Sequence, residues 1–511
     1  MKRAAITTIG MTRAGRTMKA PSQPMVALVR CLSFILAAGS AAHAEFRFSK
    51  IADDATPVPG SSQNFVTVGG PVLANGKVAF IGTVPSGHRG IYLYQEGEIQ
   101  DIVDPSHADI DEIRVSGALA FDGDTIAFAA TDSQGVKGLY THSRGEIRLI
   151  VNEHTPIPDD TNTFGEVAVF VDFRPLFVTG DTVVLSFQAF NNTDFSAGSG
   201  IYAHSEGRLR KIVDEETPLP DGTGHFDLGH RESYVVASNG KSTVLFYRGT
   251  FYIIANDLVS ALPRLEIPIA SFQDFLLSLD CRIGELQLQA LIDTGVIDME
   301  KQVVYVQDAL AIDMDAQGRI AFHGVIWEPF VNPKARSYLH SSLYIHDGGD
   351  LRIAADLKGS SSPFPALDQG HVAFSGAVDS GNGIFFHIDN KTLSVVDVGG
   401  LLDGKNIERL DLARGALSGK SMVFSALLEG SKEAIYVAEY IPDYLVELVS
   451  GWNLIGGPIP SVDTGDVEAS GRIWPVFLKR ENRRFKRASM LEYGKGYYVY
   501  SYGEGTLTLR D

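Results

Sequence analysis

The residue types best suited to bind a metal lie close together near the middle of the chain. His225, Asp227 and His230 fall within six residues, and zinc accepts imidazole and carboxylate ligands. Their segment departs from the repeat described below, and such departures often mark function. No further ligand is identifiable nearby, and ordinary loop composition explains the segment equally well. We therefore predict neither a metal nor another cofactor, and keep these three residues as weak metal candidates.

Three other histidines share one position in the repeat. His142, His204 and His346 each lie two residues after a tyrosine. Repeat-equivalent residues converge on one metal only when they line the innermost strand of each unit. These belong to the third strand, so we expect ordinary surface histidines.

Carboxylates recur before Thr-Pro-x-Pro segments. Asp53, Asp214 and the pair Asn152 and Glu153 occupy equivalent positions, and oxygen ligands on loops can bind calcium. No calcium loop of the D-x-[DN]-x-[DN]-G type occurs. Because proline restricts the backbone on both sides of its peptide bond, a rigid connector between repeats is the simpler interpretation.

No catalytic motif stands out from the rest of the sequence. Nucleophile-elbow, zinc-protease, phosphate-loop and dinucleotide patterns are all lacking in a suitable setting. Paired carboxylates for glycosidase chemistry cannot be picked out of 62 acids. The run 479–487 is strongly basic and would suit an anionic surface polymer, a lipid or the acidic repeat region. A solvated hairpin is its simpler interpretation.

An internal repeat positions all of these residues. A Gly-Ile-Tyr or Gly-Leu-Tyr start leads to a Gly and then to a strand-like run ending in Asp or Asn, at 90–104, 138–152 and 200–214. Apolar residues alternate or run for four to six positions and then break at Gly, Asp or Asn. This pattern indicates strands joined by tight turns, and hence an all-β protein.

Each unit is predicted to hold four strands. In the third unit they fall near 168–178, 182–189, 200–205 and 208–214. Val/Ile-Ala-Phe-like elements recur near residues 79, 127, 185, 245, 321, 373 and 423. One gap is about 20 residues too long, which predicts an irregular insertion at about 257–312. Residues 285–306 could instead be a degraded eighth unit, so we favour seven blades and keep eight open.

The two ends of the repeat region are complementary. Residues 46–60 match the end of a repeat, whereas the last repeat stops after residues 434–437 and lacks that ending. The N-terminal strand can therefore complete the last unit, which would remove the exposed edges of an open array. We predict a β-propeller over 45–440, closed by its N-terminal strand, in preference to an open solenoid.

Composition changes at residue 441. Residues 45–440 carry 53 acidic and 29 basic residues, whereas 441–511 carry nine of each. The segment contains Gly-Trp-Asn-Leu-Ile at 451–455 and Gly-Lys-Gly-Tyr-Tyr-Val at 494–499. It resembles a small β domain found at the ends of secreted bacterial proteins, which implies architecture but no activity. We expect Trp452 to dominate its core. The repeat region likewise resembles uncharacterised exported bacterial repeat proteins.

The N-terminus has the three parts of a secretory signal. Residues 1–44 hold six basic and no acidic residues, an apolar run at 31–38 and an Ala-His-Ala site before Glu45. The run is too short to span a membrane, and translation could begin at Met18 or Met25. An uncleaved anchor is the alternative. Cleavage changes the net charge from −18 to −24, which disfavours nucleic acid.

These observations predict an exported, monomeric, non-enzymatic binding or scaffold protein. The compartment would be the periplasm, the cell surface or the medium, and the partner a glycan or another cell-surface component. The alternative is a propeller enzyme that acts on extracellular polysaccharide. A cluster of acids, His or Tyr from several blades at the channel mouth would favour the enzyme.

Overall fold

The computed structural model describes residues 46–509 with gaps, and the chain divides into two compact units. The larger unit is Phe48–Glu439, and the smaller one joins Tyr440–Asp511 with Met1–Arg47. The gaps of three residues or more are 104–109, 114–118, 167–169, 191–197, 229–233, 266–290, 293–295, 300–302, 305–307, 328–337, 359–363, 457–461, 464–466 and 492–495.

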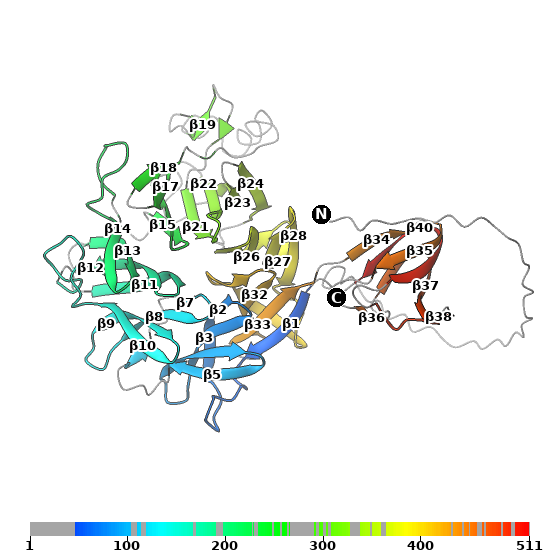
Figure 1. Ribbon diagram of the computed structural model, residues 1–511. Coiled ribbons are helices and arrows are strands. Elements are labelled where there is room, and N and C mark those ends of the chain that lie inside the picture. The colour runs from blue at the N-terminus through cyan, green and yellow to red at the C-terminus, as the bar shows by residue number, and fades with distance from the viewer. Residues whose placement is uncertain are drawn as a thin grey trace, which may run out of the picture. The chain divides into compact units, whose positions relative to one another are not determined.

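The larger unit is a seven-bladed β-propeller (Figure 1). Blade 1 holds β2 (Thr67–Ala74), β3 (Lys77–Thr83), β4 (Arg89–Gln95) and β5 (Glu98–Val103). Blade 2 holds β6 (Glu112–Ile113), β7 (Ala120–Phe121), β8 (Thr125–Thr131), β9 (Lys137–Ser143) and β10 (Glu146–Asn152). Blade 3 holds β11 (Phe170–Thr179), β12 (Thr182–Phe190), β13 (Gly198–Ser205) and β14 (Arg208–Asp214). Blade 4 holds β15 (Tyr234–Ser238), β16 (Thr243–Tyr247), β17 (Thr250–Ala255) and β18 (Leu258–Ala261).

The remaining blades follow the same plan. Blade 5 holds β21 (Asp308–Met314), β22 (Ile320–Trp327), β23 (Tyr338–Asp347) and β24 (Asp350–Asp356). Blade 6 holds β25 (Pro365–Asp368), β26 (His371–Val378), β27 (Gly381–Ile388) and β28 (Lys391–Asp397). Blade 7 holds β29 (Leu401–Leu402), β30 (Lys405–Asp411), β31 (Leu417–Ser418), β32 (Ser421–Leu428), β33 (Glu433–Tyr440) and β1 (Phe46–Ala52).

Burial explains the strand order within each blade. The second strand is covered on both faces, as in β3, where residues 78–82 are all buried. The fourth strand is exposed along much of its length, as in β5. Tight turns join the strands: Asn75 and Gly76 between β2 and β3 have φ of 52° and 74°, which Asn and Gly adopt most easily. The four strands predicted for blade 3 are confirmed to within two residues at each end.

The predicted closure is confirmed. β1 pairs with β33, so the N-terminal strand becomes the outer strand of the last blade. Around the ring the inner strands contact one another in sequence, from β2 through β7, β11, β15, β21 and β25 to β31 and back to β2. Seven blades complete this circle, and the described part of the chain holds no eighth blade; residues 285–290 lie outside the described residues. Instead, β19 (Ile297–Asp298) and β20 (Val303–Val304) form a two-stranded sheet, and their apolar residues pack with blades 4 and 5.

A belt of hydrogen bonds joins the turns that follow the inner strands. Asn75 Nδ2 donates to the Asp122 carbonyl at 2.9 Å, and the Gly180 amide donates to Asp122 Oδ2 at 2.6 Å. Similar bonds link the other turns: Asn239 to Asp315, Gly370 to Asp315, Gly419 to Asp368, and Asn75 to Ser418. They bridge six of the seven blade junctions. Between blades 3 and 4, Phe177 packs closely on Gly240.

The smaller unit is a β domain, as predicted. Its main sheet contains β34 (Tyr444–Leu448), β35 (Gly451–Gly456), β37 (Val467–Glu481), β38 (Arg484–Arg487) and β40 (Gly496–Leu509). β36 (Val462–Asp463) pairs with β39 (Met490–Leu491). The expectation for Trp452 is wrong, because its side chain is 54% exposed. Tyr497, which is fully buried, is a core aromatic of this domain. Within the described part of the chain, no helix has the length and apolar character needed to cross a membrane.

Candidate functional site

The three repeat-equivalent histidines lie where the repeat predicted. His142 is on β9, His204 on β13 and His346 on β23, the third strand of three different blades. Each is half-buried, and burial lowers the pKa of each imidazole. Among described residues, no three His, Cys, Asp or Glu side chains are grouped closely enough to hold a metal ion.

The segment around His225 follows the repeat more closely than its sequence suggests. His225 forms a bridge with Pro218, as Asn64 does with Pro57 and Thr163 with Pro156. His225 is therefore the equivalent of two ordinary loop residues, and it is exposed. Asp227 and His230 lie outside the described residues, so the metal candidate stays a prediction.

In each connector, the Asp or Asn is hydrogen-bonded to the Thr three residues later, and this pair of bonds closes a turn. Asp214 accepts from Thr217 Oγ1 at 2.8 Å, and its backbone amide donates back to that hydroxyl at 3.0 Å. Asp53 with Thr56, and Asn152 with Thr155, make the same pair of bonds. The other oxygen of Asp214 pairs with Lys211 at 2.9 Å, and that of Asp53 with Lys50 at 3.0 Å. These contacts support the rigid-connector interpretation over a calcium site.

Each connector also inserts a phenylalanine into the core. Phe65, Phe164 and Phe226 lie at equivalent loop positions and are at most 2% exposed. Each ring meets a strand tyrosine nearly at right angles: Phe65 meets Tyr92 at 4.7 Å, Phe164 meets Tyr202 at 5.2 Å and Phe226 meets Tyr252 at 5.0 Å. We call the loops 53–65, 152–164 and 214–226 the anchored loops. Sequence reasoning identified their Thr-Pro-x-Pro part but missed the phenylalanine.

The anchored loops all lie on one face of the propeller. They join the fourth strand of one blade to the first strand of the next, which places them opposite the hydrogen-bonded belt. Between the Asp/Asn–Thr turn and the buried phenylalanine, each loop exposes a short polar tip, at residues 60–63, 159–162 and 221–223. Rigid loops on a stable scaffold are the usual position of binding residues.

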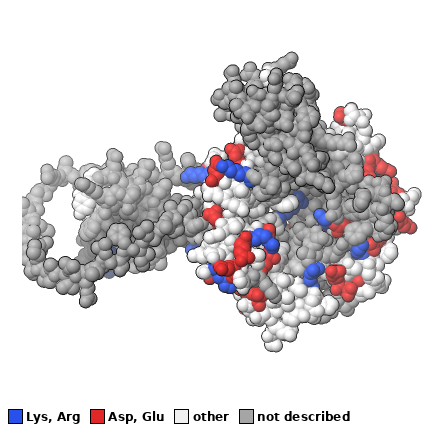
Figure 2. Space-filling view, turned by 180° about the vertical axis from the view of Figure 1, so that it is seen from behind, with Lys and Arg blue, Asp and Glu red and all other residues white. Residues whose placement is uncertain are grey.

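Two of these loops share a negative electrostatic field. Burial raises the pKa of the Tyr202 hydroxyl, and nearby carboxylates, led by Asp214 and Asp160, raise it further. Burial lowers the pKa of Lys211, but its bond to Asp214 and the nearby charges of Asp159 and Glu216 outweigh this and raise it. Figure 2 shows Asp and Glu gathered along the right-hand rim of the propeller. This field would attract a cationic group, and its carboxylates can accept hydrogen bonds from hydroxyl groups.

A second cluster joins the inner strands of four blades. Arg414, between β30 and β31 of blade 7, donates to the carbonyls of Val236 at 2.7 Å and Ile312 at 3.2 Å. Asp313 on β21 accepts from the Leu367 amide of blade 6 at 2.9 Å. Burial raises the pKa of Asp313 to about 6, against the attraction of Arg414, and burial lowers the pKa of Arg414. A carboxyl group of this kind can hold a proton at mildly acidic pH.

Two buried histidines escaped the sequence analysis. His323 on β22 is fully buried and its Nε2 bonds Ser341 Oγ at 2.7 Å, while His387 on β27 bonds Thr392 Oγ1 at 2.9 Å. Burial lowers the pKa of both to about 4, so both are neutral near pH 7. They lie inside blades 5 and 6, and their hydroxyl partners indicate a structural role.

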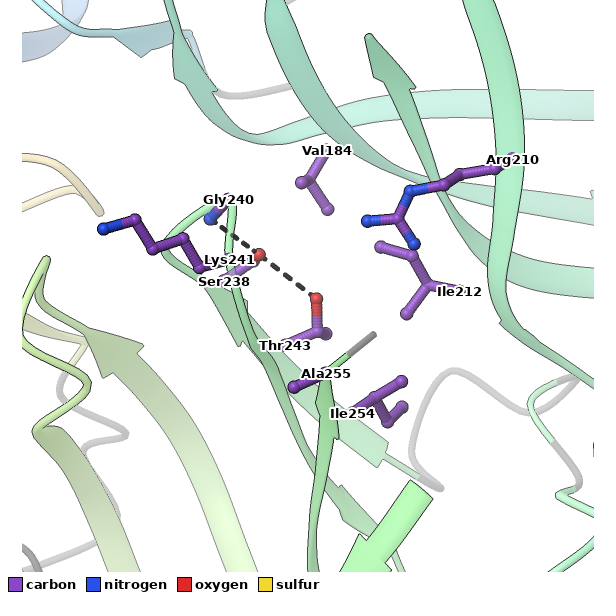
Figure 3. A pocket seen from close by; sticks show the side chains of 9 residues that line it. All are labelled: Val184, Arg210, Ile212, Ser238, Gly240, Lys241, Thr243, Ile254 and Ala255. Atoms are coloured by element: carbon purple, nitrogen blue, oxygen red, sulfur yellow. Dashed lines mark hydrogen bonds between the residues drawn. The ribbon is translucent and has the colours of Figure 1, made fainter. Parts of the chain in front are cut away.

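A small cavity lies at the junction of blades 3 and 4 (Figure 3). Arg210 points toward it, and Ser238 and Thr243 bond each other at 3.1 Å on its wall. Its volume is about 10 Å³, enough for roughly one water molecule. It is too small for an organic ligand.

Comparison with known proteins finds remote likeness to three solved structures and a match to a family of unknown function. Three solved structures are similar: the β-propeller domain of the Trilobed protease from Pyrococcus furiosus (11% identity, 73% of this chain and 93% of that chain, TM-score 0.42), an oligogalacturonate lyase in complex with manganese (9%, 78% and 98%, 0.38), and a fucose-recognising six-bladed lectin from Aleuria aurantia (9%, 65% and 96%, 0.32). No curated protein matches the sequence. Residues 37–250, which reach into blade 4, match a family of unknown function, DUF7453.

Proposed function

We propose that this chain is an exported, non-enzymatic binding or scaffold protein that contacts its ligand through the anchored loops. The observation that carries the proposal is their threefold repetition. Each has the same Asp/Asn–Thr turn, the same bridge and the same buried phenylalanine. The polar tips vary, with Ser61 and Gln63 in one loop, Asp159 and Asp160 in the second, and Asp221 in the third.

A constant anchor with a variable tip suits recognition. Binding costs less when the contacting loop is already ordered, because little conformational entropy is lost. The tips offer carboxylate and amide oxygens, which accept hydrogen bonds from hydroxyl groups. The ligand we favour is therefore a glycan or another cell-surface component rich in such groups. The excess of acid disfavours polyanions at this face.

Export is part of the same proposal. The signal-like residues 1–44 support removal of the N-terminus before Glu45, which leaves β1 as the start of the mature chain. N-terminal sequencing of protein from the periplasm and the culture medium tests this. An intact N-terminus on a cytoplasmic species would contradict it.

The binding test is a glycan array probed with the full mature chain. The change Asp159→Asn with Asp160→Asn removes two tip charges without touching the anchor, and we expect it to weaken the strongest signals at least about tenfold. Asp389→Asn, in the β27–β28 turn on the opposite face, is the matched control and should leave them unchanged. Equal binding by all three proteins would place the ligand elsewhere.

The second candidate is an enzyme acting on extracellular polysaccharide. It is favoured by Asp313, whose pKa of about 6 suits a general acid and which lies with Arg414 where four blades meet. A reducing-end assay on the array-positive glycans tests it. Release of new reducing ends that stops in Asp313→Asn would favour the enzyme over the binding protein.

A further inference from the structure

The smaller unit exposes aromatic side chains that belong to no site described above. Trp452 is 54% and Tyr502 63% exposed, although both residue types are usually covered. The ring of Tyr500 lies 5.2 Å from that of Trp452 and 5.0 Å from that of Tyr502, at 70° and 79° respectively. The three rings form one continuous surface patch, and exposed patches of this kind mark interaction sites.

Strand alternation sets this patch on one side of the sheet. Along β40, Tyr497, Val499 and Ser501 are buried, whereas Tyr498 and Tyr500 are half-buried and Tyr502 is exposed. Trp452 on β35 lies directly opposite Tyr500. Trp452, Tyr498, Tyr500 and Tyr502 therefore lie on one side of the sheet, and we call these four residues the aromatic face.

Positive charge adjoins the aromatic face on the same sheet. The hairpin of β37 and β38 contains six Lys or Arg and one Glu within residues 479–487. Lys486 and Arg487 are exposed. The register runs from Arg487 through Leu478 to Tyr498, so a basic residue and the aromatic face share one row of the sheet.

We propose that the aromatic face and its basic hairpin bind an acidic polysaccharide, a polymer of the uronate type. The C–H face of a pyranose ring packs on Trp and Tyr rings, while carboxylates of the polymer pair with Arg487, which shares a row with Tyr498. Trp, Tyr and Arg are the residues that most often dominate binding energy. This proposal uses a different surface from the anchored loops and does not rest on their function.

The test is binding of the full mature chain to polygalacturonate by isothermal calorimetry at 0.05 M and 0.5 M salt. We expect Trp452→Ala to weaken binding at least about tenfold, and Tyr502→Ala to weaken it in the same direction. Phe364→Ala is the matched control, because this propeller residue is 50% exposed, and its affinity should equal that of the parent. Circular dichroism melting should show all three variants folded like the parent.

The charge contribution is tested separately. Arg487→Gln should weaken binding severalfold at 0.05 M salt and much less at 0.5 M, because salt screens exposed charges. Lys486→Gln is the matched control, because strand alternation places Lys486 on the other side of the sheet from Arg487. Unchanged binding by Trp452→Ala, or equal affinity for neutral dextran, would overturn the proposal. So would a preference for anionic phospholipid vesicles, for an oligonucleotide or for a second copy of the chain, seen by sedimentation. The variant with Asp159→Asn and Asp160→Asn should bind polygalacturonate like the parent, even where it loses its signals on the glycan array. The two proposals can therefore fail independently.

Discussion

The Asp313 carboxyl group should make the stability of the propeller depend on pH in a defined direction. Burial raises its pKa from 3.8 to about 6 in the folded protein. The folded state therefore holds this proton more tightly than the unfolded chain. The stabilisation that this proton gives the folded state is fully present below pH 3.8. It is lost as the pH rises through about 6. At about 1.4 kcal/mol for each pH unit, the loss amounts to about 3 kcal/mol at pH 7.

Asp313→Asn isolates this effect, because the amide keeps an oxygen for the Leu367 N–H but cannot ionise. Free energies of unfolding for parent and variant would be measured by urea titration between pH 4 and pH 7.5. Relative to the parent, the variant should gain about 2.5 kcal/mol between pH 4 and pH 7.5, whatever its offset at pH 4. Arg414→Met removes the nearby cation, which should raise the pKa of Asp313 further and extend the dependence to higher pH. A difference between parent and Asp313→Asn that stays constant to within about 0.5 kcal/mol would refute the reasoning.

Three further predictions concern the internal stability of each unit taken separately. Phe164→Ala should lower the free energy of unfolding of the propeller by about 3–5 kcal/mol, measured by urea titration, and a loss below about 1 kcal/mol would mean that the ring anchors nothing. Deleting residues 45–52 should bare the edge of β33 and cause light scattering or a broadened calorimetric transition; a melt like that of the parent would contradict closure by β1. Tyr497→Ala should make 440–511 sensitive to limited proteolysis while Trp452→Ala does not; equal resistance of both would mean that Tyr497 is no core residue.

The repeat made the propeller predictable from sequence. Turn residues such as Asn75 and Gly76, and the buried runs of the second strands, recur at a spacing that only a few architectures satisfy. The pairing of β1 with β33 could be predicted because the last repeat lacks its outer strand, and the N-terminal residues match that strand. The eighth unit was a reasonable alternative, since the stretch near Ile297 and Val304 is apolar. It is apolar because it packs with blades 4 and 5 and not because it forms a blade.

The inner cluster could not be predicted in the same way. Arg414 bonds the carbonyls of Val236 and Ile312, which precede it by 178 and 102 residues. Neither partner contributes a side chain to these bonds, so no residue type signals the contact. The anchor phenylalanines could have been predicted, because Phe65, Phe164 and Phe226 each lie nine residues after the Thr of their Thr-Pro-x-Pro segments. The variable tips between each Thr-Pro-x-Pro segment and its phenylalanine obscure this spacing.

Trp452 shows why residue type alone assigns a role poorly in a small sheet. A large aromatic side chain in a strand is expected to be buried, but a sheet has two faces, and a shift of one residue moves each side chain from one face to the other. Register decides the matter: Trp452 pairs with Tyr500, and Tyr500 alternates with the buried Tyr497, Val499 and Ser501 along β40. The aromatic side chains of alternate residues thus lie on the outer face, where they add little to stability. Their exposure instead favours a role in binding, which the polygalacturonate experiment tests directly.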